Sequence, residues 1–299
     1  MKKIQPLLFL LMVLAPFLSL ANDCSSINLI TNEDSPFSKI PVYNQGKINI
    51  CYAYSAAQMA DYHLIKQGNS ERSVHPFWVA LNYAQLMKRE NIQIGHPKEA
   101  LEALTNFSNC DYQTVNKALS MLDTQETSTS RLMEMVKDAC SAPLRTKLSL
   151  PSAKRMNFRT LNSDEAYARF IMNRLNEVDS PISIAYCSNV WKKPNFGGIS
   201  FNSRGERDVL PKGCQYHESL VVGKKQIAGS CHFLVRNTWG TNWASTNKNW
   251  NCLCRNNKTG ALADDCSFET HREDYSVEAC WLPMDQLSKN IGQVTTLDL

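Results

Sequence analysis

The chain has 299 residues, of which 43% are hydrophobic and 20% are charged, and its formal net charge at pH 7 is +4. A chain of this length can form one large two-lobed domain or two small domains. Because no block of lysine or arginine stands out, we do not expect a nucleic acid as its partner.

The first 21 residues predict a secretory signal peptide. Lys2 and Lys3 precede an apolar run over residues 7–20, and the stretch closes with Ser19-Leu20-Ala21, whose small residues suit a signal peptidase. The run is interrupted by Pro16 and is shorter than the roughly 20 apolar residues that a membrane span needs. We therefore expect export to a secreted or periplasmic location, no membrane anchor, and a mature chain over residues 22–299.

Eleven cysteines are typical of an exported chain in an oxidising compartment, where most of them should form disulfide bonds. An odd total leaves at least one cysteine unpaired, and removing Cys51 leaves ten, enough for five bridges. The cluster of Cys252, Cys254, Cys266 and Cys280 could instead hold zinc, but it contains no Cys-x-x-Cys pair, so disulfides are favoured. We expect neither a metal nor a cofactor.

A predicted helix begins at Cys51. Small or apolar residues recur at helical spacing over residues 53–64, Asn49 is a candidate N-cap, and Gly68 stands just past the expected end. A cysteine in the first turn lies near the positive end of the helix dipole, which favours the thiolate, the form that attacks a carbonyl carbon. The alternative is that Cys51 is a small buried apolar residue.

Further along the chain, helices are predicted over residues 77–87, 98–104, 114–122 and 130–139, followed by a loop over residues 141–160. Ser163 then begins a well-marked helix that runs to about Val178. Strands are predicted over residues 181–186, 217–222 and 232–236, and the last two are joined by a polar turn of residues 223–226 and their neighbours. This order predicts an α+β fold with a helical lobe over about 22–140, a β lobe over about 141–299, and a ligand cleft between them.

A nucleophilic cysteine needs a base, and four of the six histidines are poor candidates. His63 lies twelve residues after Cys51 on the same predicted helix, which places it about 18 Å away. His75 and His96 each precede a proline in a predicted loop, and His271 falls in a charged stretch, so we expect these three to be solvated.

His217 and His232 remain, both on predicted strands. Asn237 ends the second of these strands and offers an amide that could orient an imidazole. His232 is five residues before Asn237, so the two side chains would point to opposite faces of a regular strand, whereas His217 has no such conflict. Trp239 could shield the histidine–amide hydrogen bond from water. We therefore favour His217 as the base.

At these positions the chain resembles the papain-like cysteine proteases. The resemblance lies in three blocks in the family's order, which are Asn44-Gln45-Gly46 with Cys51-Tyr52-Ala53-Tyr54-Ser55-Ala56, then His217 to Gly223, then Asn237 to Trp243. It implies a two-lobed fold in which a helical lobe faces an antiparallel, β-barrel-like lobe, and it implies a peptide or protein substrate.

The resemblance also implies a role for each site residue. Cys51 would be the nucleophile, His217 the general base and acid, Asn237 the residue that orients the imidazole, and Gln45 a side-chain donor to the oxyanion hole. The resting state would then be a thiolate paired with a protonated imidazole.

The sequence departs from the family's pattern close to the nucleophile. Ile48 and Tyr52 stand where many relatives have cysteine and tryptophan, and the 23 residues between Ala21 and Gln45 are fewer than the family's usual inhibitory propeptide. Three functions therefore stay open, namely an exported cysteine peptidase, a non-catalytic peptide- or partner-binding protein, and an acyl transferase that uses the same Cys-His site.

Overall fold

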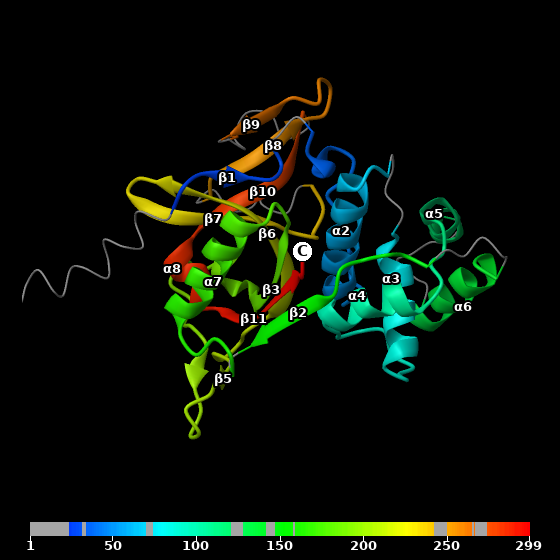
Figure 1. Cartoon of the computed structure of the whole chain (residues 1–299), viewed down its shortest axis with the longest axis horizontal. Helices are drawn as coiled ribbons and strands as arrows, with labels where there is room; N and C mark the ends of the chain where they lie inside the picture. Colours follow the sequence, from blue (N-terminus) through cyan, green and yellow to red (C-terminus); the bar gives the residue numbers. More distant parts are fainter. Residues whose placement is uncertain are drawn as a thin grey trace, which may run out of the picture.

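The computed structural model describes residues 24–31, 34–69, 74–120, 128–141, 147–157, 159–241, 250–264, 266 and 274–299 (Figure 1). The predicted signal peptide and His271 lie outside these residues. In the part of the chain that is described, no helix is long and apolar enough to cross a membrane.

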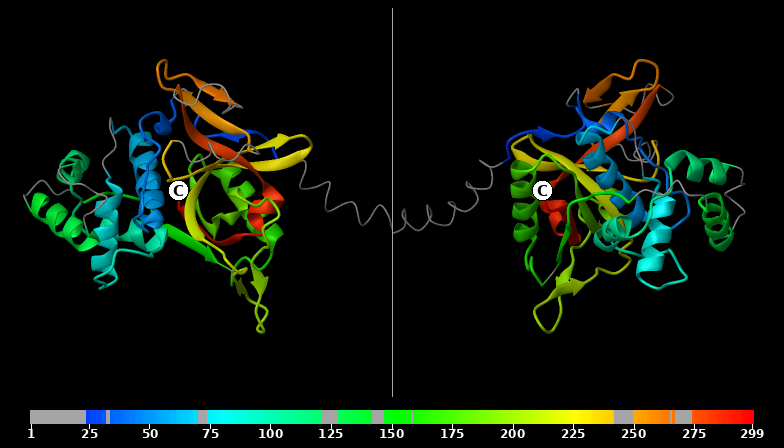
Figure 2. Two further views of the ribbon diagram at one scale, coloured as in Figure 1. Left: turned by 180° about the vertical axis from the view of Figure 1, so that it is seen from behind. Right: turned by 45° about the vertical axis from the view of Figure 1, so that its right-hand side comes forward.

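The described secondary structure between residues 51 and 139 is helical. The helices are α2 (Cys51–Lys66), α3 (Pro76–Leu86), α4 (Pro97–Asn106), α5 (Tyr112–Ser120) and α6 (Thr129–Ala139), preceded by the short 3-10 helix η1 (Pro36–Ser38). α2 lies against the sheet, α3 and α4 pack on α2, and α5 and α6 pack on each other farther out, as all views in Figures 1 and 2 show. The disulfide between Cys110 and Cys140 closes this outer pair of helices.

The second lobe is built on one antiparallel sheet. Its strands follow the order β2 (Ala153–Asn157), β11 (Ile291–Leu297), β3 (Ile182–Cys187), β6 (Tyr216–Ile227), β7 (Ser230–Arg236), β10 (Tyr275–Pro283), β8 (Cys252–Asn256) and β9 (Leu262–Asp264), and β1 (Ile27–Asn28) also pairs with β6. Between the described strands this path is open and does not close into a barrel. The α+β, two-lobed fold expected from the sequence is confirmed.

The remaining elements lie around this sheet. α7 (Asp164–Glu177) precedes β3, α8 (Met284–Ser288) precedes β11, the 3-10 helix η2 (Ser188–Trp191) follows β3, and β4 (Ser200–Phe201) pairs with β5 (Arg207–Val209) in a separate hairpin. α7 is capped by Ser163, whose side chain accepts from the Ala166 N–H, and it carries acids in its first turn, as its sequence predicted.

Two hydrophobic cores lie on opposite faces of the sheet. Leu220 and Val222 of β6 join the core that contains the alanine-rich face of α2. Val221, between them, joins the core formed with Tyr167 and Ile171 of α7. This is the alternation that a strand buried on both faces requires, and it lets β6 present neighbouring residues to different surroundings.

Three local predictions were wrong. The N-cap of α2 is Ile50 and makes no side-chain cap hydrogen bond, so Asn49 does not cap the helix. Residues 223–226 continue β6, and the turn falls at Ala228 and Gly229, both with positive φ. The predicted loop over 141–160 contains β2, whose burial pattern does not alternate and whose formation depends on pairing with the distant β11.

Five disulfides join ten of the eleven cysteines, and Cys51 is the free one, as cysteine counting favoured. Cys252 pairs with Cys280 and Cys254 with Cys266, so the four residues weighed as zinc ligands are disulfide-bonded. Cys24 pairs with Cys231 and Cys187 with Cys214.

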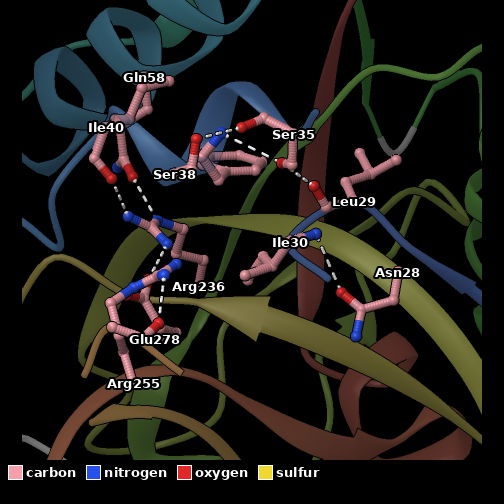
Figure 3. Close-up of polar contacts among 12 residues, drawn as sticks. Asn28, Leu29, Ile30, Ser35, Ser38, Ile40, Gln58, Arg236, Arg255 and Glu278 are labelled. Carbon is pink, nitrogen blue, oxygen red and sulfur yellow. Dashed lines mark hydrogen bonds and ion pairs between the residues drawn. The ribbon is translucent and has the colours of Figure 1, made fainter. Parts of the chain in front are cut away.

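A buried arginine ties the two lobes together (Figure 3). Arg236 of β7 is fully buried; its Nε donates to Gln58 Oε1 of α2 at 3.0 Å and its Nη2 donates to the Ile40 carbonyl at 2.6 Å. Its third nitrogen pairs with Glu278 of β10, which also accepts from Arg255 at 2.7 Å. The residue directly before Asn237 is therefore fixed by groups from both lobes.

Candidate active site

The segment before α2 is paired with the segment after β7, and this brings the first and third sequence blocks together. Asn44 forms an isolated bridge with Trp239, the Gln45 N–H donates to the Thr238 carbonyl at 2.9 Å, and the Gly240 N–H donates to the Tyr43 carbonyl at 2.9 Å. Cys51, at the first residue of α2, follows this paired segment directly.

His217 is fixed on β6 by Asn237. Its Nε2 lies 2.7 Å from Asn237 Oδ1, and both side chains are buried, with 5% and 0% of their surfaces exposed. The Thr238 N–H also donates to this Oδ1 at 2.7 Å, and a backbone N–H can only donate, so the atom is the amide oxygen. His217 Nε2 therefore carries its proton, and in the neutral ring Nδ1 is the free base.

Trp239 covers this hydrogen-bonded pair. Its ring stacks on the His217 ring with centroids 4.5 Å apart and an interplanar angle of 29°. Ser219, two residues along β6, donates to the same Asn237 Oδ1 at 3.2 Å. The imidazole is therefore held by an amide on one edge and an indole on one face, in a setting that excludes water.

The Cys51 thiol lies against the strand that carries His217. Burial raises the pKa of Cys51 to about 12, and the negative charge of Glu218 adds to this; hydrogen bonding from the backbone at Glu218, Tyr52 and Cys51 itself acts in the opposite direction. Burial also lowers the pKa of His217 to about 4, against the opposing effect of its hydrogen bond to Asn237. Both shifts favour the neutral form of the group, because burial disfavours charge, whereas the expected resting thiolate–imidazolium pair stays a prediction.

Gln45 is held by the residue that follows Asn237. The Thr238 hydroxyl donates to Gln45 Oε1 at 2.6 Å, which leaves the two N–H bonds of Gln45 Nε2 as the donors on this side chain. Gln45 is buried, six residues before Cys51. Its amide nitrogen and the backbone N–H groups of the first turn of α2 are the candidate donors for an oxyanion.

A comparison with solved structures bears on the fold of this chain. The fold is similar to that of papain-like cysteine proteases. Xylellain, a cysteine protease from Xylella fastidiosa, is 16% identical, with 93% of this chain and 88% of that chain covered and a TM-score of 0.49. Digestive procathepsin L 3 from Tenebrio molitor larval midgut is 11% identical, with 92% and 69% covered and a TM-score of 0.47.

A structure concerned with the mite allergens Blo t 1 and Der p 1 is 16% identical, with 88% of this chain and 77% of that chain covered and a TM-score of 0.45. No protein-family model matches the sequence, and no curated protein sequence matches it. The likeness bears on the arrangement of the chain alone, and the roles of the site residues rest on their own geometry.

The other histidines lie in different surroundings. His63 is buried near the end of α2, and His232 lies at the far end of β7, where its Nδ1 contacts the Ser230 carbonyl at 3.0 Å. His75 is not solvated as expected, because it caps α3 by accepting from the Phe77 N–H at 3.1 Å. His96 is also withdrawn from water, and burial lowers its pKa.

Two residues of the site escaped the sequence analysis. Glu218 follows His217 directly, and its buried carboxyl has a pKa raised to about 8, chiefly by burial. Thr238 lies between Asn237 and Trp239 and orients Gln45. Only adjacency to a candidate residue could have pointed to either, since glutamate and threonine occur at many ordinary strand positions.

Proposed function

We propose that this chain is an exported cysteine peptidase that cleaves peptide bonds through a Cys51 acyl-enzyme. The observation that carries the proposal is a free thiol at Cys51, hydrogen-bonded by the backbone at Glu218, with the preceding residue of that strand, the buried His217, held through its Nε2–H by Asn237 Oδ1 at 2.7 Å. This hydrogen bond leaves Nδ1 as the base, and a positioned base and a thiol are what thiol-dependent acyl transfer needs.

In the proposed reaction the thiol and imidazole start as neutral groups. As Cys51 Sγ adds to the peptide carbonyl carbon, its proton moves to His217 Nδ1, and the imidazolium that forms is stabilised by Asn237 Oδ1. The carbonyl oxygen gains negative charge and accepts hydrogen bonds from Gln45 Nε2 and the Cys51 backbone N–H. The imidazolium then protonates the leaving amine, and water releases the acid from the thioester with the same base.

Export is part of the proposal. The five disulfides of the described chain fit an oxidising compartment, and the predicted signal peptide supplies the route to a secreted or periplasmic site. We propose residues 22–299 as the mature peptidase unit.

The test is covalent labelling followed by hydrolysis. The mature protein is treated with an epoxide probe for thiol proteases, and the adduct is mapped by mass. We expect labelling at Cys51 that is lost in His217→Ala and retained in His232→Ala, the matched control. A Cys51→Ala variant that keeps full peptide hydrolysis would contradict the proposal.

One observation favours a second candidate, a non-catalytic peptide-binding protein. Burial holds Cys51 as a neutral thiol in the unliganded site, and such a thiol is a weak nucleophile unless the base acts on it. A folded protein in which Cys51 resists the probe but which still binds peptides would favour this candidate. Adding an amine acceptor to a hydrolysis assay separates hydrolysis from acyl transfer to that amine.

A further inference from the structure

Glu218 is a buried carboxyl without an ion-pair partner beside the candidate nucleophile. Only 4% of its surface is exposed, and its backbone takes part in hydrogen bonding to Cys51. Within the described chain its carboxyl makes one hydrogen bond, in which Ser183 Oγ donates to Oε2 at 3.2 Å, and no cation lies within 4.0 Å of it. A buried carboxyl without a cationic partner stays protonated, and it can ionise when a ligand supplies the positive charge.

The nearest basic residue is engaged elsewhere. Arg155 of β2 acts electrostatically on Glu218, but its guanidinium pairs with Glu99 Oε1 of α4 at 3.0 Å. Glu99 adds a second negative charge to the same region and raises the pKa of Glu218 further. The guanidinium that acts on Glu218 is therefore already paired with another carboxyl.

The sheet places further polar groups beside Glu218. Ala185 pairs with Glu218 on one side and with Gln293 on the other, so the three side chains stand in a row on one face with the small alanine in the middle. This face lies toward α4, which packs on β2 and β11. Among the described residues, three buried atoms here have no hydrogen-bond partner: Gln293 Nε2, Glu99 Oε2 and His96 Nδ1.

Such a set of unsatisfied groups indicates a ligand position. Buried polar atoms are nearly always paired in folded proteins, and several orphans around one unpaired carboxyl need a common partner. The carboxyl groups of Glu218 and Glu99 can accept hydrogen bonds, Gln293 Nε2 can donate, and His96 Nδ1 can do either according to its tautomer. A guanidinium or ammonium group carries the donors and the positive charge that this set lacks.

We propose that Glu218, with Glu99 and Gln293, binds a basic side chain of the substrate next to the scissile bond. This inference rests on the proposed peptidase function and names its substrate class: peptides with arginine or lysine close to the bond that is cut. Glu218 determines this specificity, and the carboxylate charge that forms on binding is neutralised by the substrate itself.

Binding is coupled to ionisation. The titratable groups whose charges interact with Glu218 are Cys51 on α2, Glu99 on α4, Arg155 on β2, Tyr186 on β3 and Tyr216 on β6. Since the pKa of Glu218 is about 8, its carboxyl is mostly protonated at pH 7, and a cationic side chain ionises it. Each basic peptide that binds at pH 7 therefore releases close to one proton.

The test uses Cys51→Ala protein so that binding is measured without turnover. Blocked pentapeptides carry arginine, or its neutral isostere citrulline, at each position in turn, and affinities come from calorimetric titration. We expect about 10- to 100-fold tighter binding of arginine at one position. Glu218→Gln should abolish this preference, and Glu102→Gln, a partly exposed carboxylate of α4 paired with Lys98, should leave it intact.

Proton release gives a second readout that does not depend on the folding of Glu218→Gln. Titrations of Cys51→Ala at pH 7 in buffers of different ionisation enthalpy should show a proton released with the arginine peptide and none with citrulline. Equal affinity at every position, or a preference that survives Glu218→Gln, would overturn the inference.

The two proposals fail in different ways. Hydrolysis by the Cys51 protein without any preference for a basic residue would overturn the inference and leave the peptidase function standing. The opposite result is that the protein binds the arginine peptide preferentially but hydrolyses none of the pentapeptides. It would support the basic-side-chain site and count against the peptidase function.

Discussion

Thr238 donates its hydroxyl hydrogen to Gln45 Oε1 at 2.6 Å. Thr238 follows Asn237, which orients the imidazole, and it also orients the Gln45 amide that is expected to bind the oxyanion. Thr238 and Gln45 are 193 positions apart in the sequence. The backbone hydrogen bond from Gln45 N to the Thr238 carbonyl, at 2.9 Å, holds them in register. A change at Thr238 should therefore act on catalysis through Gln45.

Thr238→Val keeps the shape of the side chain and removes its donor. Gln45 Oε1 then loses its partner, and a buried group left unsatisfied costs about 1–3 kcal/mol. We expect kcat to fall about 5- to 150-fold with little change in KM, because the oxyanion exists in the transition state. Thr238→Ser should restore activity. A fall in KM alone, or no rescue by serine, would contradict this role.

Asn237→Ala should remove the acceptor that fixes the proton on His217 Nε2. The ring is then free to place its proton on Nδ1, where it cannot accept from the thiol, and the imidazolium loses its stabilising partner. We expect kcat/KM to fall by about 10-fold or more, within the range for general-base catalysis. The melting temperature, measured in parallel, reports any loss of fold, and an unchanged kcat/KM would count against the proposed orientation.

Glu218→Gln should alter the pH dependence of stability in a defined direction. In the wild-type protein the unfolded chain loses this proton near pH 4.5, whereas the folded chain holds it to about pH 8. The stabilisation of the folded state is therefore complete below pH 4.5 and is lost as pH rises toward 8, at about 1.4 kcal/mol per pKa unit. The variant should gain in free energy of unfolding relative to wild type across this window, measured by urea denaturation. A constant difference would argue against the raised pKa.

The same variant should change thiol reactivity. The negative charge of Glu218 raises the pKa of Cys51, so the glutamine variant should show a rate of alkylation by iodoacetamide that rises at lower pH than in wild type. A profile that does not move, in a variant with a native circular dichroism spectrum, would show that this charge does not reach the thiol.

Arg236→Met should destabilise the protein strongly. It leaves Glu278 buried with only Arg255 as partner and removes the donors to Gln58 and Ile40. Breaking a buried pair by removing one partner costs about 3–5 kcal/mol in the free energy of unfolding. The double variant Arg236→Met, Glu278→Leu should recover part of this loss. Urea denaturation measures the free energy of unfolding of both variants. If Arg236→Met lost no more than about 1 kcal/mol, the loss would be that of an exposed ion pair and would contradict this prediction.

The sequence predicted those parts of the fold that depend on local pattern. The alanine face of α2, the Ser163 cap of α7 and the strands around Ile184 and Leu234 were all expected, because neighbouring residues determine them. The pairing of His217 with Asn237 followed from strand period and from the resemblance. The free thiol at Cys51 followed from an odd number of cysteines.

What escaped prediction depends on contacts between distant segments. Two of the three partners of Arg236 are 178 and 196 residues away in the chain and the third is 42 residues away, so no local sequence pattern predicts them. β2 exists through its pairing with β11, and the pairing of ten cysteines cannot be derived from their spacing. The raised pKa of Cys51 likewise depends on how closely other segments surround the thiol, which no local sequence pattern predicts.

The attachments of α2 to the β lobe bear on how a substrate can enter. Gln58, at the middle of the helix, is tied to Arg236, and near its end Lys66 contacts Asp179 at 2.9 Å while Tyr62 donates to the same carboxylate at 3.0 Å. A clamshell motion of the lobes would have to break all three contacts. These contacts therefore hold α2 on the β lobe, and we expect a substrate of the proposed peptidase to reach Cys51 without separation of the lobes.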